Sequence, residues 1–180
     1  MKKLKLKYED IISACTDISM QMYSDMWRPD YIVGLKRGGL VPAVIMSHMT
    51  GIKMETLSIS LHDDEESESN LWMAEHAFGY NDPQKTGITG ARWDVGLRKK
   101  ILVIDDINDT GATFQWLKQD WQSSCLPDEE SWKTVWGKNV RFASLTFNEP
   151  SSVESQYYSY AINKYEDDCW VVYPWEDNIS

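Results

Sequence analysis

Apolar and polar positions follow two different periods along this chain. Over residues 8–22, apolar side chains recur at steps of three and four, at Ile11, Cys15, Ile18 and Met22. This spacing predicts an amphipathic helix, because residues three and four apart share one helix face. The apolar face of such a helix must be buried against another part of the chain.

Short apolar runs, typical of buried strands, alternate with further helical patterns in the rest of the chain. The predicted strands cover 31–33, 53–60, 101–104, 140–147 and 157–162, and the predicted helices 40–49 and 112–123. Strands that alternate with helices form a parallel sheet covered by helices. We therefore expect one α/β domain over residues 1–180, with a central, mostly parallel sheet flanked by helices.

Three segments lack this regularity. Residues 61–99 contain an acidic run at 63–68 and a glycine-broken stretch at 86–90, so we expect 61–99 to be a flexible lid loop. Residues 126–137, which mix acids with tryptophans, are interpreted as a surface insertion. Residues 148–180 follow the last long strand and are expected to form a small hood.

Composition and charge narrow the class of protein. The chain has 180 residues, 42% of them hydrophobic, and a formal net charge of −10. These values are typical of a soluble single-domain protein and argue against nucleic-acid binding, which needs a basic face. No apolar run is long enough to cross a membrane, and the basic N-terminus lacks the apolar stretch of a signal peptide. The three cysteines are far apart in the sequence, so neither disulfides nor zinc is expected, and the predicted location is the cytoplasm.

Candidate chemistry is concentrated directly after the predicted strand 101–104. Asp105, Asp106 and Asp109 precede the turn at 110–113, which opens the next predicted helix. Open α/β sheets bind ligands at the carboxyl ends of their strands, and the N–H groups of a helix N-terminus suit a phosphate. Carboxylates accept hydrogen bonds from sugar hydroxyls and can hold magnesium. An ordinary turn with a helix cap is the alternative, but three acids this close to a glycine turn favour a site for a phosphorylated sugar.

A second turn, Lys36-Arg37-Gly38-Gly39, follows the predicted strand 31–33. In a parallel sheet this turn lies at the same edge as the acids. Glycine allows a ligand to approach the backbone closely, so the turn is a candidate binding loop. A plain glycine turn with two exposed basic side chains is the alternative.

The strand followed by two acids, two variable residues and Asp-Thr-Gly-x-Thr resembles the signature of the type I phosphoribosyltransferases. The turn at 36–39 is similar to their pyrophosphate loop, which contains a strained and often cis peptide; here that bond would be Lys36–Arg37. The tail at 168–176 resembles the C-terminal segment of the bacterial xanthine-guanine phosphoribosyltransferases. The resemblance covers three separated stretches in the right order.

This resemblance implies the type I fold and a reaction between phosphoribosyl pyrophosphate and a nucleobase, which we expect to be a purine. The products would be a nucleoside monophosphate and pyrophosphate, formed with Mg²⁺ through an oxocarbenium-like sugar. By family analogy the protein would be a homodimer. Two alternatives stay open: a regulator or ligand-binding protein that has lost catalysis, and an enzyme for a base other than a 6-oxopurine.

The resemblance also implies a role for each matching position. Asp105 and Asp106 would bind the ribose hydroxyls and the metal, with Asp106 as the first choice for magnesium. Asp109 would be the catalytic general acid/base at the purine N7. The remaining contacts would be made to pyrophosphate by Lys36, Arg37 and Gly38, to the 5′-phosphate by Thr110, Gly111, Ala112 and Thr113, and to the base by Trp170 and Val171. Arg92 and Arg98 of the expected lid are further candidates for pyrophosphate.

One position departs from the family pattern. In the purine enzymes that accept 6-oxo bases, a lysine before a proline donates to the purine O6; here Glu149 precedes Pro150. An ionised carboxylate only accepts hydrogen bonds, so Glu149 would suit a base with an exocyclic amine. The alternatives are a shift of one residue, which would make Asn148 the reader, or a Glu149 that turns to solvent.

Overall fold

A parallel sheet forms the centre of the computed structural model, which describes residues 1–61, 67 and 69–176. Across this sheet the strands follow the order β3 (Met54–Ser58), β2 (Tyr31–Lys36), β4 (Ile101–Asn108), β5 (Val140–Asn148) and β6 (Tyr157–Ile162). Every neighbouring pair is parallel. The expected α/β fold with a central parallel sheet is confirmed.

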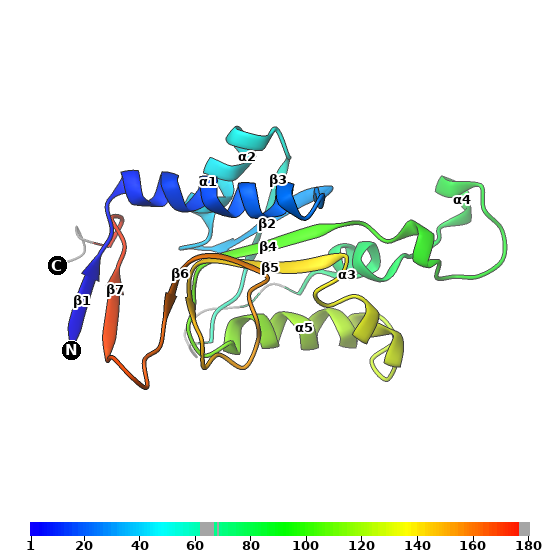
Figure 1. Ribbon diagram of the computed structural model, residues 1–180. Helices are drawn as coiled ribbons and strands as arrows, with labels where there is room; N and C mark the ends of the chain where they lie inside the picture. Colours follow the sequence, from blue (N-terminus) through cyan, green and yellow to red (C-terminus); the bar gives the residue numbers. More distant parts are fainter. Residues whose placement is uncertain (62–66, 68, 177–180) are drawn as a thin grey trace.

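Helices cover both faces of this sheet (Figure 1). On one face lie α1 (Tyr8–Ser24) and α2 (Leu40–Thr50); on the other lie α3 (Leu71–Phe78) and α5 (Ala112–Ser124). The predicted helices at 8–22, 40–49 and 112–123 therefore correspond to α1, α2 and α5.

Strand β4 shows why a strand that is buried on both faces has a continuous apolar run. Successive side chains of a strand point to opposite faces. Ile101 and Val103 enter the core on the α5 side, whereas Leu102 and Ile104 enter the core on the α1 side. All four side chains are fully buried, so β4 anchors the acids that follow it.

A second, smaller sheet joins the two ends of the chain. Strand β1 (Lys2–Lys5) pairs in parallel with β7 (Cys169–Val172), with Leu4 opposite Val171. This pair forms the expected hood at one end of the molecule (Figure 1). The hood also uses residues 2–5, which the sequence did not indicate as a strand, because three lysines in four residues carry no apolar alternation.

The segment 61–99 is more regular than expected. Helix α3 buries Met73, Ala74, Ala77 and Phe78 in the core. Gly79, in a left-handed conformation, ends the helix just after this apolar run. The prediction of one irregular lid over 61–99 is therefore wrong for α3. Most of the acidic run at 63–68 lies outside the described residues, and movement of a lid stays a prediction.

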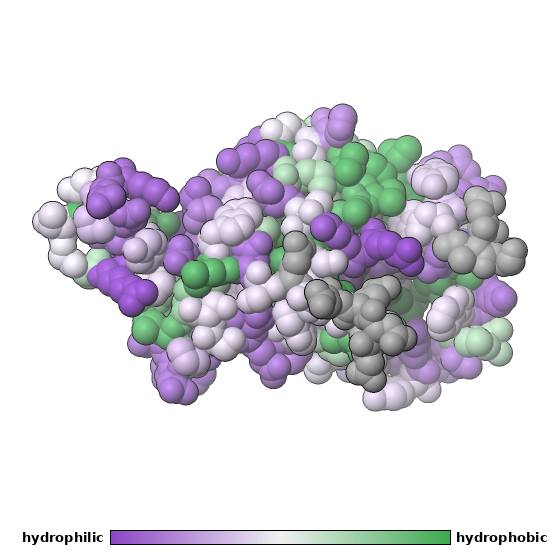
Figure 2. All heavy atoms as spheres, turned by 180° about the vertical axis from the view of Figure 1, so that it is seen from behind, coloured by the Kyte–Doolittle hydropathy of each residue, from purple (hydrophilic) through white to green (hydrophobic). Residues whose placement is uncertain are grey.

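Residues 79–99 continue past α3 towards the amino end of β4. They include α4 (Pro83–Thr86) and the short 3₁₀ helix η1 (Val95–Leu97), and α4 buries no side chain. Figure 1 shows α4 on a projection at the opposite end of the molecule from the hood. Figure 2, seen from behind, shows this projection at the left with mainly hydrophilic residues.

The segment 126–137 also contributes side chains to the core. It contains the 3₁₀ helix η2 (Glu130–Thr134), and Trp132 is only 1% exposed. The indole of Trp132 donates to the Cys125 carbonyl oxygen (2.8 Å) and stacks on Trp136 with 5.2 Å between ring centroids. The interpretation as a surface insertion is wrong for Trp132 and Trp136, which pack inward, whereas residues 126–128, 130, 133 and 134 are exposed.

Candidate active site

The acids and the glycine turn meet at the carboxyl end of two adjacent strands. Strands β2 and β4 pair so that Gly34 lies opposite Ile104. A Cβ atom placed on Gly38 would lie 2.1 Å from Asp106 Oδ2, so only glycine fits against this carboxylate. The expected cis peptide at Lys36–Arg37 is confirmed, and both side chains are exposed at the rim.

Asp105 and Asp106 form a pair of half-buried carboxylates within β4, which extends through Asn108 and so includes the acids. Asp105 Oδ1 accepts from the Asp106 N–H (2.9 Å), and Asp106 Oδ1 accepts from the Ile107 N–H (2.8 Å). Burial raises the pKa of both carboxyls, and the charge of Asp106 raises the pKa of Asp105 further. This excess of buried negative charge favours a ligand that brings hydroxyl donors or a cation.

The turn at 110–113 opens helix α5. Gly111 precedes the helix with a φ of 86°, and the Ala112 N–H contacts Thr110 Oγ1 at 3.3 Å. The backbone N–H and the hydroxyl of Ser152 both donate to the Thr110 carbonyl oxygen at 2.9 Å, which fixes the turn from the side. Free N–H groups at a helix N-terminus form a site for a phosphate.

A cleft of about 250 Å³ connects the acids of β4 with the turn at 110–113; it is lined by Leu61 and by residues 105–114. A larger hollow, about 670 Å³, lies at the amino end of the sheet, where its lining includes Met22, Met26 and Trp27. That hollow is mainly apolar and lacks paired acids. The smaller cleft is therefore the candidate active site.

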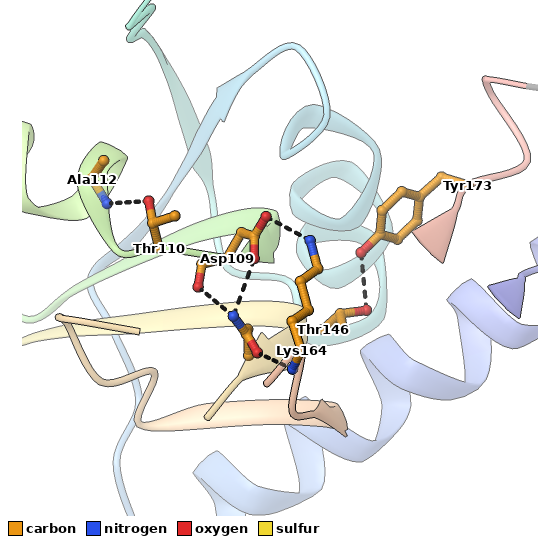
Figure 3. Close-up of polar contacts among 7 residues, drawn as sticks. Asp109, Thr110, Ala112, Thr146, Lys164 and Tyr173 are labelled. Carbon is orange, nitrogen blue, oxygen red and sulfur yellow. Dashed lines mark hydrogen bonds and ion pairs between the residues drawn. The ribbon is translucent and has the colours of Figure 1, made fainter. Parts of the chain in front are cut away.

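Asp109 is held by two side chains from later parts of the chain (Figure 3). Its Oδ2 forms an ion pair with Lys164 Nζ at 2.7 Å. Its Oδ1 and its carbonyl oxygen accept from Asn148 Nδ2 at 3.2 and 3.0 Å. The sequence reasoning missed Lys164, although it is the only lysine or arginine after Arg141 in an otherwise acidic tail.

The hood contributes one exposed ring and one buried anchor. Trp170 is 51% exposed, and its ring centroid lies 5.9 Å from Lys164 Nζ. Tyr173 is buried, and its hydroxyl donates to the Asp106 carbonyl oxygen at 2.9 Å. The same hydroxyl lies 2.9 Å from Thr146 Oγ1 (Figure 3). Burial raises the pKa of Tyr173, followed by the charge of Asp106, so the phenol remains a donor.

The side chain of Val171 is buried, and its backbone polar groups are directed away from β1. The carbonyl oxygens of Asp168 and Val172 accept from the backbone N–H groups of Lys2 and Leu6. Because hydrogen-bonding residues alternate along a parallel pair, the N–H and C=O of Val171 point to the other edge of β7. In the described part of the chain, no strand pairs with that edge.

Glu149 does not join these residues. Its side chain is exposed, and Oε2 lies 3.4 Å from Asn163 Nδ2. The alternation of β5 explains this, since Asn148 points inward and is buried. The assignment of Glu149 to the base pocket is therefore corrected, and the alternative in which Glu149 turns away from the pocket agrees with the structure.

Arg92 and Arg98 also lie elsewhere. The Arg98 guanidinium donates to the Phe78 carbonyl oxygen (3.1 Å) and to Thr134 Oγ1 (2.7 Å), and Arg92 lies over the Trp93 ring at 5.2 Å. Both arginines precede the amino end of β4, whereas the acids lie towards its carboxyl end. Their suggested contact with pyrophosphate is therefore wrong for this arrangement.

The carboxylates of the cleft suit a metal ion that is bound jointly with the substrate better than one bound by protein ligands alone. Among the described residues, no three His, Cys, Asp or Glu side chains are grouped to hold an ion. Magnesium is usually held by one or two carboxylates together with substrate phosphates and waters. The adjacent carboxylates of Asp105 and Asp106 supply this kind of partial site.

Within residues 1–61, 67 and 69–176, no helix combines the length and apolar character that a membrane span requires.

Comparisons with known proteins agree with this geometry. The chain is 22% identical to the hypoxanthine-guanine phosphoribosyltransferase of Schizosaccharomyces pombe, over 97% of this chain and 89% of the relative. It is 27% identical to the xanthine-guanine phosphoribosyltransferase of Nitratidesulfovibrio vulgaris, over 83% and 70%. The crystal structure of a purine phosphoribosyltransferase from Pyrococcus horikoshii superposes with a TM-score of 0.63 at 21% identity, covering 98% of this chain and 95% of that one.

The family model for the phosphoribosyl transferase domain matches residues 6–119, a span that contains the glycine turn, both strand-end acids and the phosphate turn. Because this match covers more than half of the chain, the protein belongs to the phosphoribosyl transferase domain family.

Proposed function

We propose that the protein is a purine phosphoribosyltransferase, which transfers the phosphoribosyl group of phosphoribosyl pyrophosphate to a purine base. The observation that carries the proposal is the contact between the Gly38 turn and Asp106, at the edge of the cleft that also contains the phosphate turn. A sugar that carries phosphate at one end and pyrophosphate at the other has charges and hydroxyls matching this row of groups.

The sugar phosphate would be bound from both ends. The N–H groups at the start of α5 and the hydroxyls of Thr110 and Thr113 would hold the 5′-phosphate. Asp105 and Asp106 would accept hydrogen bonds from the 2′ and 3′ hydroxyls. At the other end, the exposed Lys36 and Arg37 and the backbone of Gly38 would bind pyrophosphate.

Asp105 and Asp106 would also hold magnesium together with the pyrophosphate oxygens. When bound, the metal would neutralise charge that develops on the departing pyrophosphate. The protein would contribute chiefly by orienting the reactants and by placing fixed charges around the sugar carbon.

The base would lie between the hood and Asp109. The exposed Trp170 ring offers a stacking surface, and the N–H and C=O of Val171 offer hydrogen bonds along the base edge. Asp109 would face N7 and exchange a proton with it as general acid/base.

Incubation with labelled phosphoribosyl pyrophosphate, magnesium and a panel of bases tests this proposal. Hypoxanthine, guanine, xanthine, adenine and uracil should be separated by the rate of nucleoside monophosphate formation, with a purine fastest. A protein that binds phosphoribosyl pyrophosphate tightly but forms no product with any base would instead be a catalytically inactive binding protein.

The proposal also covers the cellular location and the oligomeric state of the enzyme. The buried, unpaired thiols of Cys15, Cys125 and Cys169 suit a reducing compartment such as the cytoplasm. The homodimer implied by the family resemblance stays a prediction, which light scattering of the purified protein can test.

A further inference from the structure

A buried asparagine lies shortly before the turn at 110–113, the phosphate turn. Asn108 is the last residue of β4, and its side chain is only 3% exposed. Its Nδ2 donates to the Val153 carbonyl oxygen at 2.6 Å and to Ser155 Oγ at 3.1 Å. Its Oδ1 accepts from the Ser151 hydroxyl at 2.8 Å. This amide therefore fastens residues 151–155 to the end of the strand that carries the acids.

Residues 151–155, which we call the serine segment, are also fixed to β5. Ser155 Oγ lies 2.9 Å from Ser144 Oγ on that strand, and both side chains are buried. The backbone N–H of Ser151 donates to the Asn148 carbonyl oxygen at 2.8 Å. The serine segment is thus held by two neighbouring strands of the central sheet, β4 and β5.

The serine segment packs directly against the phosphate turn. A Cβ atom placed on Gly111 would lie 2.6 Å from Ser152 Oγ and 2.7 Å from the Val153 nitrogen, so no side chain fits between them. The backbone N–H and the hydroxyl of Ser152 both donate to the Thr110 carbonyl oxygen. The turn therefore cannot move towards the serine segment, and two hydrogen bonds keep it from moving away.

The bonds to Thr110 also decide where the next N–H group points. The carbonyl of Thr110 and the N–H of Gly111 belong to one planar trans peptide unit, so they point in opposite directions. Because Ser152 holds this carbonyl, the Gly111 N–H is directed away from the serine segment. Gly111 lines the cleft, and its N–H donates to no other residue in the described part of the chain. This donor is therefore already oriented for an anion before a ligand binds.

We propose that Asn108 and Ser152 are positioning residues for the 5′-phosphate. Asn108 fixes the serine segment, and Ser152 fixes the Thr110 peptide, so that the Gly111 N–H faces the phosphate oxygens. Asn108 acts through the serine segment rather than by contact with the ligand. The inference rests on the proposed function, because it concerns the phosphate end of the same site.

Asn81 is the matched control for Asn108. Its side chain is also 3% exposed, and its Nδ2 donates to the carbonyl oxygens of Ile88 and Ala91 at 3.2 and 2.9 Å. Its Oδ1 accepts from the Thr86 hydroxyl at 2.6 Å. Asn81 precedes α4 and does not line the cleft. Alanine at either position therefore removes the same kind of buried contacts, but only at Asn108 do these contacts support the phosphate turn.

Titration calorimetry with two ligands compares Asn108→Ala with Asn81→Ala. Inosine monophosphate carries a 5′-phosphate, whereas pyrophosphate with magnesium would bind at the other end of the site. Because a displacement of about 1 Å can cost about 100-fold, Asn108→Ala should bind inosine monophosphate about 10- to 100-fold more weakly than the wild type. Its affinity for pyrophosphate should not change. Asn81→Ala should bind both ligands as the wild type does, although both variants should unfold at a lower temperature.

Three results would overturn the role of Asn108. These are unchanged binding of inosine monophosphate by Asn108→Ala, an equal loss of this affinity in Asn81→Ala, and an equal loss of affinity for pyrophosphate in Asn108→Ala. The last two would show a general effect of destabilisation rather than a displaced phosphate turn.

Ser152→Ala tests the second link without removing a buried group, and it carries the test if Asn108→Ala does not fold. Ser152 is exposed, and its backbone N–H still donates to Thr110, so the unfolding midpoint should not change. Inosine monophosphate should bind more weakly than to the wild type, by a smaller factor than in Asn108→Ala. Ser123→Ala is the control, since this exposed hydroxyl donates to the Asp120 carbonyl oxygen within α5. Equal affinities of the two serine variants would overturn the role of Ser152.

Steady-state kinetics separate this inference from the proposed function. Asn108→Ala should raise the KM for phosphoribosyl pyrophosphate and leave kcat and the KM for the base near wild type, because the 5′-phosphate is bound alike in the ground and transition states. If the wild type forms no product with any base while inosine monophosphate binding still depends on Asn108, the proposed function fails and the role of Asn108 stands. If the wild type forms product and Asn108→Ala binds inosine monophosphate equally well, the role of Asn108 fails and the function stands.

Discussion

The hydroxyl of Tyr173 donates to the backbone carbonyl oxygen of Asp106 over 2.9 Å, which ties the hood to the strand that carries the acids. The same hydroxyl lies 2.9 Å from Thr146 Oγ1 on β5. One buried side chain therefore fixes the wall that would contact the base relative to the floor that would contact the sugar.

Tyr173→Phe should destabilise the protein and loosen the hood. The substitution keeps the ring but leaves the Asp106 carbonyl and the Thr146 hydroxyl without this partner, at a cost of about 1–3 kcal/mol in the free energy of unfolding. Chemical denaturation measures this cost. In steady-state assays, the substitution should raise the KM for the base more than it raises the KM for phosphoribosyl pyrophosphate. An unchanged free energy of unfolding would mean that the hood is held mainly by its apolar contacts.

Gly38→Ala should weaken binding of phosphoribosyl pyrophosphate by at least about tenfold. The added Cβ would lie 2.1 Å from Asp106 Oδ2, so either the carboxylate or the turn must move. Gly96→Ala is the matched control, since its Cβ would meet only the Asp94 carboxylate at 3.2 Å, and Gly96 lies in η1, which precedes the amino end of β4. Equal affinities of the two variants in titration calorimetry would contradict the close packing of the turn against the acid.

Asp106→Asn should separate stability from function. Removing one of two adjacent half-buried carboxylates relieves their repulsion, while the amide oxygen can still accept from the Ile107 N–H. The ligand-free variant should therefore unfold at the same temperature as the wild type or higher, yet bind phosphoribosyl pyrophosphate and magnesium more weakly. A large drop in its unfolding temperature would favour a structural capping role for Asp106.

The partly buried His76 should lower the free energy of unfolding in acid. Burial lowers its pKa to about 4 from 6.5, helped by the nearby charge of Lys99, and the Tyr31 hydroxyl lies 3.0 Å from Nδ1. Between these two pH values the unfolded chain binds a proton that the folded protein does not, so stability falls as the pH is lowered from 6.5 towards 4.

The measurement is the free energy of unfolding at pH 7 and pH 5 for the wild type and for His76→Asn. The asparagine has no titrating group but can still accept from Tyr31, so its loss of stability between the two pH values should be smaller. Equal losses in the two proteins would show that other groups cause the acid sensitivity.

The sequence predicted those parts of the fold that depend on local pattern. The apolar run at 101–104, the glycine turn at 36–39 and the turn at 110–113 each carry their signal within a few residues, and the structure places all three at one edge of the sheet. Strand β1 could not be predicted in this way, because its only strand partner among the described residues, β7, lies at the other end of the chain.

The base site was less accessible to sequence reasoning. Lys164 and Asp109 are 55 residues apart, and their contact depends on how β6 returns beside β5. Glu149 was placed in the pocket by alignment on Pro150, but the alternation of β5 points Asn148 inward instead. The turn after β6 instead places Lys164 beside Asp109.

The rate of inosine monophosphate formation from hypoxanthine, phosphoribosyl pyrophosphate and magnesium tests the central claim most directly. The account predicts steady formation by the wild type, loss of product in excess chelator with recovery on adding magnesium, and a rate about 10²–10⁴-fold lower for Asp109→Asn at unchanged affinity for phosphoribosyl pyrophosphate. No product from hypoxanthine or any other base, or an Asp109→Asn rate equal to that of the wild type, would contradict it.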